Sequence, residues 1–154
     1  MAIIEFARNK LNLKKATSSE FDKKGLPIIG LINEWTKDGK KIKGTETDLG
    51  GTMRLGSYDA KLKENSMIKK IYNKNLIKER HRHRYEVNIA YKEKFEKNGM
   101  LFSGLSPDGK LPEIIELKNH PWFIGVQFHP EFKSRPLSPH PLFSSFIKAS
   151  KNHK

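Results

Sequence analysis

The chain has 154 residues, the length of a single domain with one core, and we assign residues 1–150 to that domain and residues 151–154 to a frayed tail. A hydrophobic fraction of 36%, a mean hydropathy of −0.69 and the lack of any apolar run near the ~20 residues of a membrane span argue against a membrane protein. The lack of cysteine excludes disulfides and zinc–thiolate sites within the chain and suits a cytoplasmic protein, and the net charge of +13 raises nucleic acid or an anionic membrane as partners.

The first third of the chain predicts one helix and one buried strand, separated by polar segments. Apolar residues at 3, 4, 7 and 11 recur at helical spacing and predict an amphipathic helix over 3–13. Neither a capping residue nor the features of a signal peptide precede it, so we expect a helix cut off from earlier sequence. Residues 16–22 predict a polar loop, 26–32 a short buried strand and 37–43 a charged turn.

A glycine pair marks the next segment, Asp48-Leu49-Gly50-Gly51-Thr52-Met53-Arg54-Leu55-Gly56. The glycine spacing differs from that of a phosphate-binding loop, and no helix clearly follows. We therefore favour a bend where two backbones approach closely, followed by a strand, over a ligand cradle.

Helices and strands alternate through the rest of the chain. We expect helices over 66–73, 90–98 and 141–149, the second of them ended by Gly99. We expect strands over 100–105, 113–117 and 122–126, the first two joined in a hairpin. This alternation, without repeats or low-complexity segments, predicts an α/β fold.

The strand over 122–126 leads into His129, Pro130 and Glu131. Successive strand side chains alternate between faces, so His129 and Glu131 are expected to point the same way. A carboxylate beside an imidazole sets its tautomer and stabilises its protonated form. This is the base-and-orienter half of a nucleophilic triad, and the nucleophile is missing.

His81, His83, His129 and Glu131 are residue types that could ligate a metal ion. We reject a metal site, because the arginines that flank the two histidines of the His-x-His pattern raise the cost of binding another positive charge. The sequence therefore predicts no metal.

The run Arg80-His81-Arg82-His83-Arg84 has two explanations that the residues alone do not separate. Guanidinium groups bind phosphate oxygens and also carboxylates, so the run suits phosphates or RNA as well as a carboxylate ligand. Strand alternation would let only one face of the run point into a pocket. The lysines are spread along the whole chain, as in a protein from an AT-rich genome, so charge alone is a weak argument for nucleic acid.

Taken together, these motifs resemble the glutaminase (class I glutamine amidotransferase) domain of CTP synthases. The resemblance covers nearly all of 2–150 and is most specific in the Gly50–Gly56 and Glu79–Asn88 segments. Its other parts are Ile4-Glu5-Phe6, Ser19-Glu20-Phe21, Glu113-Ile114-Ile115-Glu116, His120-Pro121-Trp122-Phe123, Gln127-Phe128-His129-Pro130-Glu131-Phe132 and His140-Pro141-Leu142-Phe143.

The resemblance implies a role for four residues. In that family a cysteine thiolate attacks the glutamine carboxamide and forms a glutamyl thioester. His129 matches the histidine that moves the proton, and Glu131 the carboxylate that orients it. Glu20 and Arg84 match the residues that hold the α-amino and α-carboxylate groups of L-glutamine, which favours carboxylate recognition over RNA for Arg84.

The resemblance also implies a partial fold, a mixed central sheet flanked by helices with its N-terminal strands missing. The family's cysteine would fall just upstream of Met1, so we expect no glutaminase activity from the isolated chain. The expected partner is a synthetase domain or an upstream chain that carries the cysteine, in a homotetramer. The full-length family uses ATP and Mg²⁺ with UTP, and GTP as effector, whereas this chain itself needs no cofactor. The alternative is a non-catalytic remnant or binding module.

Overall fold

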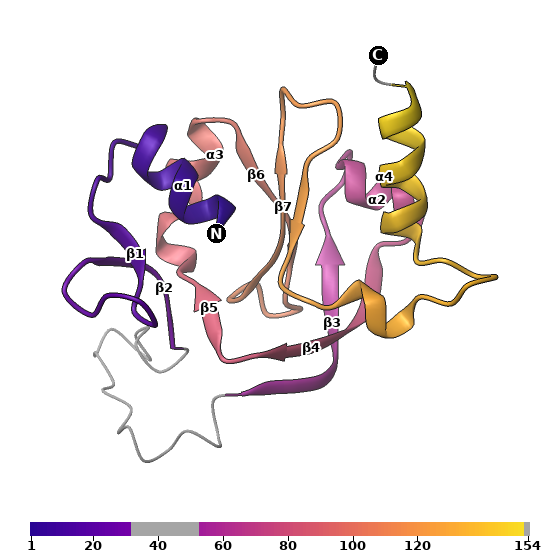
Figure 1. Cartoon of the computed structure of the whole chain (residues 1–154), viewed down its shortest axis with the longest axis horizontal. Coiled ribbons are helices and arrows are strands. Elements are labelled where there is room, and N and C mark those ends of the chain that lie inside the picture. The colour runs from indigo at the N-terminus through magenta and orange to yellow at the C-terminus, as the bar shows by residue number, and fades with distance from the viewer. Residues whose placement is uncertain (32–52, 153–154) are drawn as a thin grey trace.

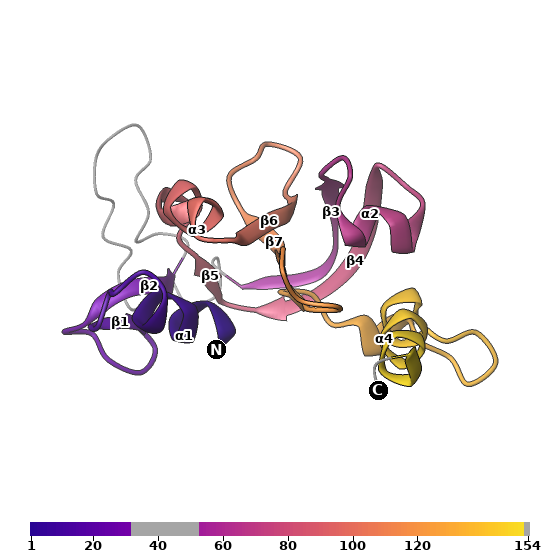
Figure 2. The same cartoon turned by 90° about the horizontal axis from the view of Figure 1, so that it is seen from above.

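The structure, a computed structural model, describes residues 1–31 and 53–152 of the chain. Within these ranges eight strands form a three-stranded and a five-stranded sheet, and four α-helices lie against them (Figures 1 and 2). The predicted mixed α/β fold is therefore confirmed. No helix in the described ranges is long and apolar enough to cross a membrane.

The smaller sheet contains β1 (Ala16–Ser18), β2 (Leu26–Leu31) and β5 (Tyr85–Val87) in the order β1-β2-β5. β1 is parallel to β2, and β5 is antiparallel to β2. The prediction for β2 is confirmed. The polar loop predicted over 16–22 is wrong for β1, whose three residues are all buried. So short a strand of small residues carries no alternating pattern, and its pairing with β2 makes it a strand.

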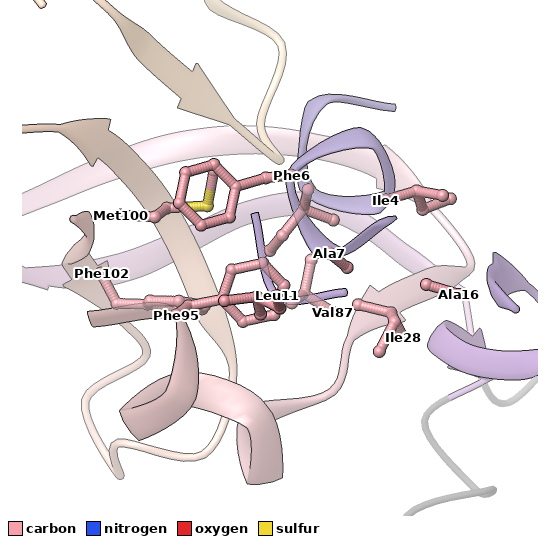
Figure 3. Close-up of a cluster of buried hydrophobic side chains, with 11 residues drawn as sticks. Ile4, Phe6, Ala7, Leu11, Ala16, Ile28, Val87, Phe95, Met100 and Phe102 are labelled. Atoms are coloured by element: carbon pink, nitrogen blue, oxygen red, sulfur yellow. The ribbon is translucent and has the colours of Figure 1, made fainter. Parts of the chain in front are cut away.

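Helix α1 (Ala2–Asn9) covers one side of this sheet (Figure 1). It ends earlier than the predicted 3–13, and the chain then turns, with Asn12 in the left-handed region at a φ of +56°. Its apolar side chains still enter the main core cluster, where Phe6 stacks on Phe95 at a centroid distance of 5.8 Å (Figure 3). Leu11 lies beyond the helix and joins the same cluster.

The larger sheet has the order β4-β3-β6-β7-β8 and is antiparallel throughout. Its strands are β3 (Arg54–Leu62), β4 (Leu76–His83), β6 (Met100–Leu105), β7 (Pro112–Leu117) and β8 (Ile124–Val126). The hairpin of β6 and β7 confirms the prediction. β3 pairs with β4 along its length but with β6 only at its end, and β4 lies at the edge of the sheet. Beyond β6, the two strands extend toward the smaller sheet, where β4 leads into β5 (Figure 1).

The predicted helix over 66–73 is α2 (Met67–Tyr72). Ser66 Oγ caps it by accepting from Lys69 N, and the chain leaves it at Asn73 in the left-handed region. The buried Glu116 carboxylate of β7 accepts the backbone N–H groups of Met67 and Ile68, each at 2.9 Å. The Glu116 carboxylate of β7 therefore binds the N-terminus of this short helix, the positive end of its dipole.

The other two predicted helices are also present. A 3₁₀ turn (Ile89–Tyr91) leads into α3 (Lys92–Lys97), and Gly99 follows it with a φ of +98°. Helix α4 (Pro141–Asn152) packs near α2. The glycine bend at Gly50 and the charged turn over 37–43 lie outside the described residues.

Candidate active site

His129 and Glu131 lie in a different element from the one predicted. β8 ends at Val126, and its residues are only half-buried. A 3₁₀ turn, η3 (Pro130–Lys133), begins directly after His129. Strand alternation is therefore wrong as the reason for their proximity. Pro130 occupies the first position of η3, where its fixed φ suits a helical turn, and the turn brings the two side chains together.

The two side chains are in direct contact. Nδ1 of His129 lies 2.8 Å from Oε1 of Glu131. The hydrogen bond to His129 holds the pKa of the Glu131 carboxyl below its ordinary value. Since the carboxylate accepts from Nδ1–H, Nε2 of the neutral imidazole is an unprotonated base, and this nitrogen has no partner in the described part of the chain. The pair can thus take up a proton at Nε2 and stabilise the resulting imidazolium.

Two contacts fix the place of the imidazole. The backbone N–H of His129 donates to the carbonyl oxygen of Arg80 in β4 at 2.8 Å. The Phe132 ring stacks on the imidazole with a centroid distance of 5.2 Å. The first contact ties the start of η3 to the edge strand of the larger sheet.

The arginine run is split between two faces of β4, as strand alternation predicts. Arg80 and Arg82 are exposed, whereas His81 is buried and His83 half-buried. The two histidines contact each other through Nδ1 of His81 and Nε2 of His83 at 2.9 Å. In the residues that the structure describes, no group of three or more His, Cys, Asp or Glu side chains is placed to hold a metal ion.

The two predicted substrate-binding residues lie on loops beside the smaller sheet. Glu20 is exposed in the turn after β1, and Arg84 is half-buried in the bend between β4 and β5. Their strands are linked through β2, since the N–H of Ser19 donates to Ile29 O and Ile29 pairs with Val87. Within the described ranges, neither side chain forms a hydrogen bond or ion pair, so the structure does not bring them into contact with His129.

Sequence reasoning missed a buried charge network behind this site. Nη1 of Arg54 lies 2.7 Å from Oε1 of Glu113 and 3.2 Å from Oε1 of Glu86, and all three side chains are buried. The Gln127 amide donates to Glu86 and to the carbonyl of Pro112. A carboxylate within an apolar strand, as in Glu113-Ile114-Ile115, is the signal that points to such a network, because a buried charge needs a partner.

The histidines determine which carboxylate in this network holds a proton. Burial lowers the pKa of His81 to about 3 and that of His83 to about 4, so both are neutral at pH 7. Nδ1 of His83 faces the carbonyl of Tyr85 at 3.1 Å and must be protonated, so its Nε2 accepts from Nδ1–H of His81. Nε2 of His81 is then a bare lone pair, 3.5 Å from Oε2 of Glu113.

Glu113 is therefore placed to hold a proton. Its Oε2 is buried without a hydrogen-bond donor, and burial raises the pKa of Glu113 to about 7 even though Arg54 opposes the shift. A proton on Oε2 would face the lone pair of His81. Burial raises the pKa of Glu86 as well, and Arg54 and Gln127, from which its carboxylate accepts hydrogen bonds, oppose this shift.

Comparison with known proteins shows the family of the chain. The model of the family "Glutamine amidotransferase class-I" matches residues 5–149. The chain belongs to this family. The resemblance seen in the motifs is thus confirmed, and the comparisons include CTP synthases in particular.

The chain is 89% identical over its whole length to the CTP synthase of Pelagibacter ubique, of which it covers 29%. It is 60% identical to that of Hyphomonas neptunium over 97% of the chain and 28% of the relative. The chain therefore spans less than a third of the curated relatives it matches. A solved structure, "Trypanosoma brucei CTPS - glutaminase domain with bound acivicin", is 34% identical with a TM-score of 0.83, over 99% of this chain and 57% of that one.

Proposed function

We propose that the chain is the part of a CTP synthase glutaminase that carries its acid–base pair and its substrate-recognition residues. The observation that carries the proposal is the 2.8 Å contact between Nδ1 of His129 and Glu131, with Nε2 free, in a class-I glutamine amidotransferase. The acivicin-bound relative supports a glutamine-binding site in such a domain.

In the proposed mechanism, Nε2 of His129 takes the thiol proton of a cysteine as the thiolate attacks the glutamine carboxamide. The same nitrogen then gives the proton to the leaving ammonia, while Glu131 stabilises the imidazolium between the two transfers. Water subsequently hydrolyses the thioester to glutamate. The chain contains no cysteine, so sequence outside it must supply the thiolate.

We infer from this that the isolated chain does not hydrolyse glutamine. In a serine-protease triad, loss of the nucleophile lowers kcat by about 10⁶-fold. Glu20 would bind the α-ammonium and Arg84 the α-carboxylate of glutamine, since each offers the opposite charge. The exposed position of Glu20 and the half-buried position of Arg84 leave both side chains accessible to a ligand.

The remaining functions belong to the whole protein. We propose that ammonia passes to a synthetase domain that uses ATP and Mg²⁺ to aminate UTP to CTP, with GTP as effector, in a cytoplasmic homotetramer. The lack of a cysteine in the chain is the observation that favours the alternative, a non-catalytic remnant or binding module.

A chimera distinguishes the glutaminase function from the non-catalytic alternative. The 154 residues would replace the aligned segment of the Pelagibacter ubique CTP synthase, and glutamate release from glutamine would be assayed. We expect activity in the chimera and its loss in His129→Ala. A folded chimera without activity would favour the remnant, and normal hydrolysis by His129→Ala would exclude the acid–base role of His129.

A further inference from the structure

The η3 turn, which carries the His129–Glu131 pair, is hydrogen-bonded to β4 at both of its ends. At its start, the N–H of His129 donates to the carbonyl of Arg80. At its end, Nζ of Lys133 donates to the carbonyl of Lys78 at 2.5 Å. These two carbonyls are two residues apart on the edge strand, so they point to the same side, away from β3. Glu131 lies between the two attachments.

Lys133 also completes a buried polar cluster beneath the turn. Oε1 of the buried Glu79 lies 3.1 Å from the Tyr72 hydroxyl, 3.3 Å from Nε2 of His140 and 3.5 Å from Nζ of Lys133. The backbone N–H of Leu142 donates to Nδ1 of His140 at 3.3 Å, so Nε2 of His140 carries the proton that is donated to Glu79.

In the part of the chain that the structure describes, Lys133 is the lysine that contacts Glu79. Burial by itself would raise the pKa of Glu79, but the hydrogen bond from His140 and the charge of Lys133 outweigh burial and hold this pKa below its ordinary value. Glu79 is thus a buried carboxylate, and its counter-charge comes from the turn that bears the acid–base pair. A buried charge that loses its partner is strongly destabilised, so the contact holds Lys133 in place.

We propose that Lys133, held by Glu79, is a positioning residue that sets the placement of His129 and Glu131 against β4. The proposal rests on the glutaminase function proposed above. The Lys133 side chain is 43% exposed, so its truncation leaves no core cavity, and its effect on stability comes from the buried Glu79 carboxylate, which loses its cation. Arg84 follows β4, so the same edge strand relates the acid–base pair to the residue proposed to bind the substrate carboxylate.

The test uses Lys133→Met in the chimera, with Lys148→Met as the matched control on the exposed surface of α4. Methionine keeps the length of the side chain and removes the charge and the donor. We expect kcat for glutamine to fall about 3- to 10-fold with KM within about twofold, because only the reacting groups are misplaced. Lys133→Arg should recover most of the loss.

Hydrogen exchange gives a readout that does not depend on activity. Exchange over residues 128–134 should be faster in Lys133→Met than in the control, since the His129 N–H loses protection. Unchanged exchange would overturn the proposal, as would faster exchange with normal kcat, or a rise in KM alone. If the unmodified chimera is inactive, the proposed function fails, and exchange alone decides whether Lys133 anchors the turn.

Discussion

Gln127, two residues before His129, donates a hydrogen bond from its side-chain amide to the carboxylate of Glu86, two residues after Arg84. His129 and Arg84 therefore each lie two residues from one end of the same part-buried hydrogen bond. Glu86 is in turn held by Arg54, so the network of Arg54, Glu86 and Glu113 supports both halves of the candidate site.

Arg54→Met should be among the most destabilising substitutions on β3. It removes the cation and the hydrogen-bond donor from two buried carboxyl groups, and breaking a buried ion pair from one side costs about 3–5 kcal/mol. The measurement is the calorimetric unfolding temperature of the chimera. The exposed Arg82→Met is the control and should change stability by less than about 0.5 kcal/mol. Equal unfolding temperatures for the two variants would show that the network does not stabilise the fold.

The raised pKa of Glu113 predicts that the stability of the fold depends on pH. Its pKa rises from 4.5 to about 7 on folding, so the folded state binds more protons than the unfolded state between these values. The contribution of Glu113 is complete below pH 4.5 and is lost as pH rises through about 7. The loss is of the order of 3 kcal/mol, since one pKa unit corresponds to about 1.4 kcal/mol.

Glu113→Gln checks this dependence. Glutamine keeps an acceptor for Arg54 and a donor for Nε2 of His81, as the protonated acid does. The variant should therefore gain stability relative to the unmodified chimera as pH rises between pH 4.5 and about 7. Unfolding temperatures that run parallel across this window would mean that Glu113 does not hold the proton.

Glu131→Gln should lower kcat with little change in KM. The amide cannot stabilise the imidazolium, and it can offer N–H instead of an acceptor to Nδ1 of His129, which favours the wrong tautomer. Because the Glu131 side chain is 56% exposed and solvent screens its charge, we expect a loss of about 10- to 100-fold, less than for a buried triad carboxylate. Steady-state glutamine hydrolysis measures it, and an unchanged kcat would contradict the orienting role.

Elements with their own periodicity or caps were predictable from the sequence. Helix α2 lies between Ser66 and Asn73 as expected, and the β6–β7 hairpin follows from its alternation and turn. β1 was missed because its strand character comes from pairing with β2. Most of β3 was missed too, because only its first residues continue an apolar pattern and its partner is the arginine-rich β4.

The candidate site also contains features that the sequence predicts and others that it does not. The proximity of His129 and Glu131 was predicted, but from the wrong geometry, because spacing alone does not distinguish a strand from a 3₁₀ turn that begins at Pro130. The link between Arg54 and Glu113 joins residues far apart in the chain, and no local pattern encodes such a pair. The roles of Glu20 and Arg84 remain predictions.

Arg84→Met tests the substrate side of the proposal. If Arg84 binds the glutamine α-carboxylate, its loss removes a charge-assisted hydrogen bond worth about 1.5–3 kcal/mol, so KM should rise about 10- to 100-fold. The substitution Arg82→Met is matched in kind but lies on the exposed face of β4 and should leave KM within about twofold. Because a lysine restores charge without the bidentate geometry, Arg84→Lys should recover only part of the affinity. Steady-state glutamine hydrolysis by the chimera distinguishes these outcomes, and equal KM values for the two methionine variants would remove Arg84 from the substrate site.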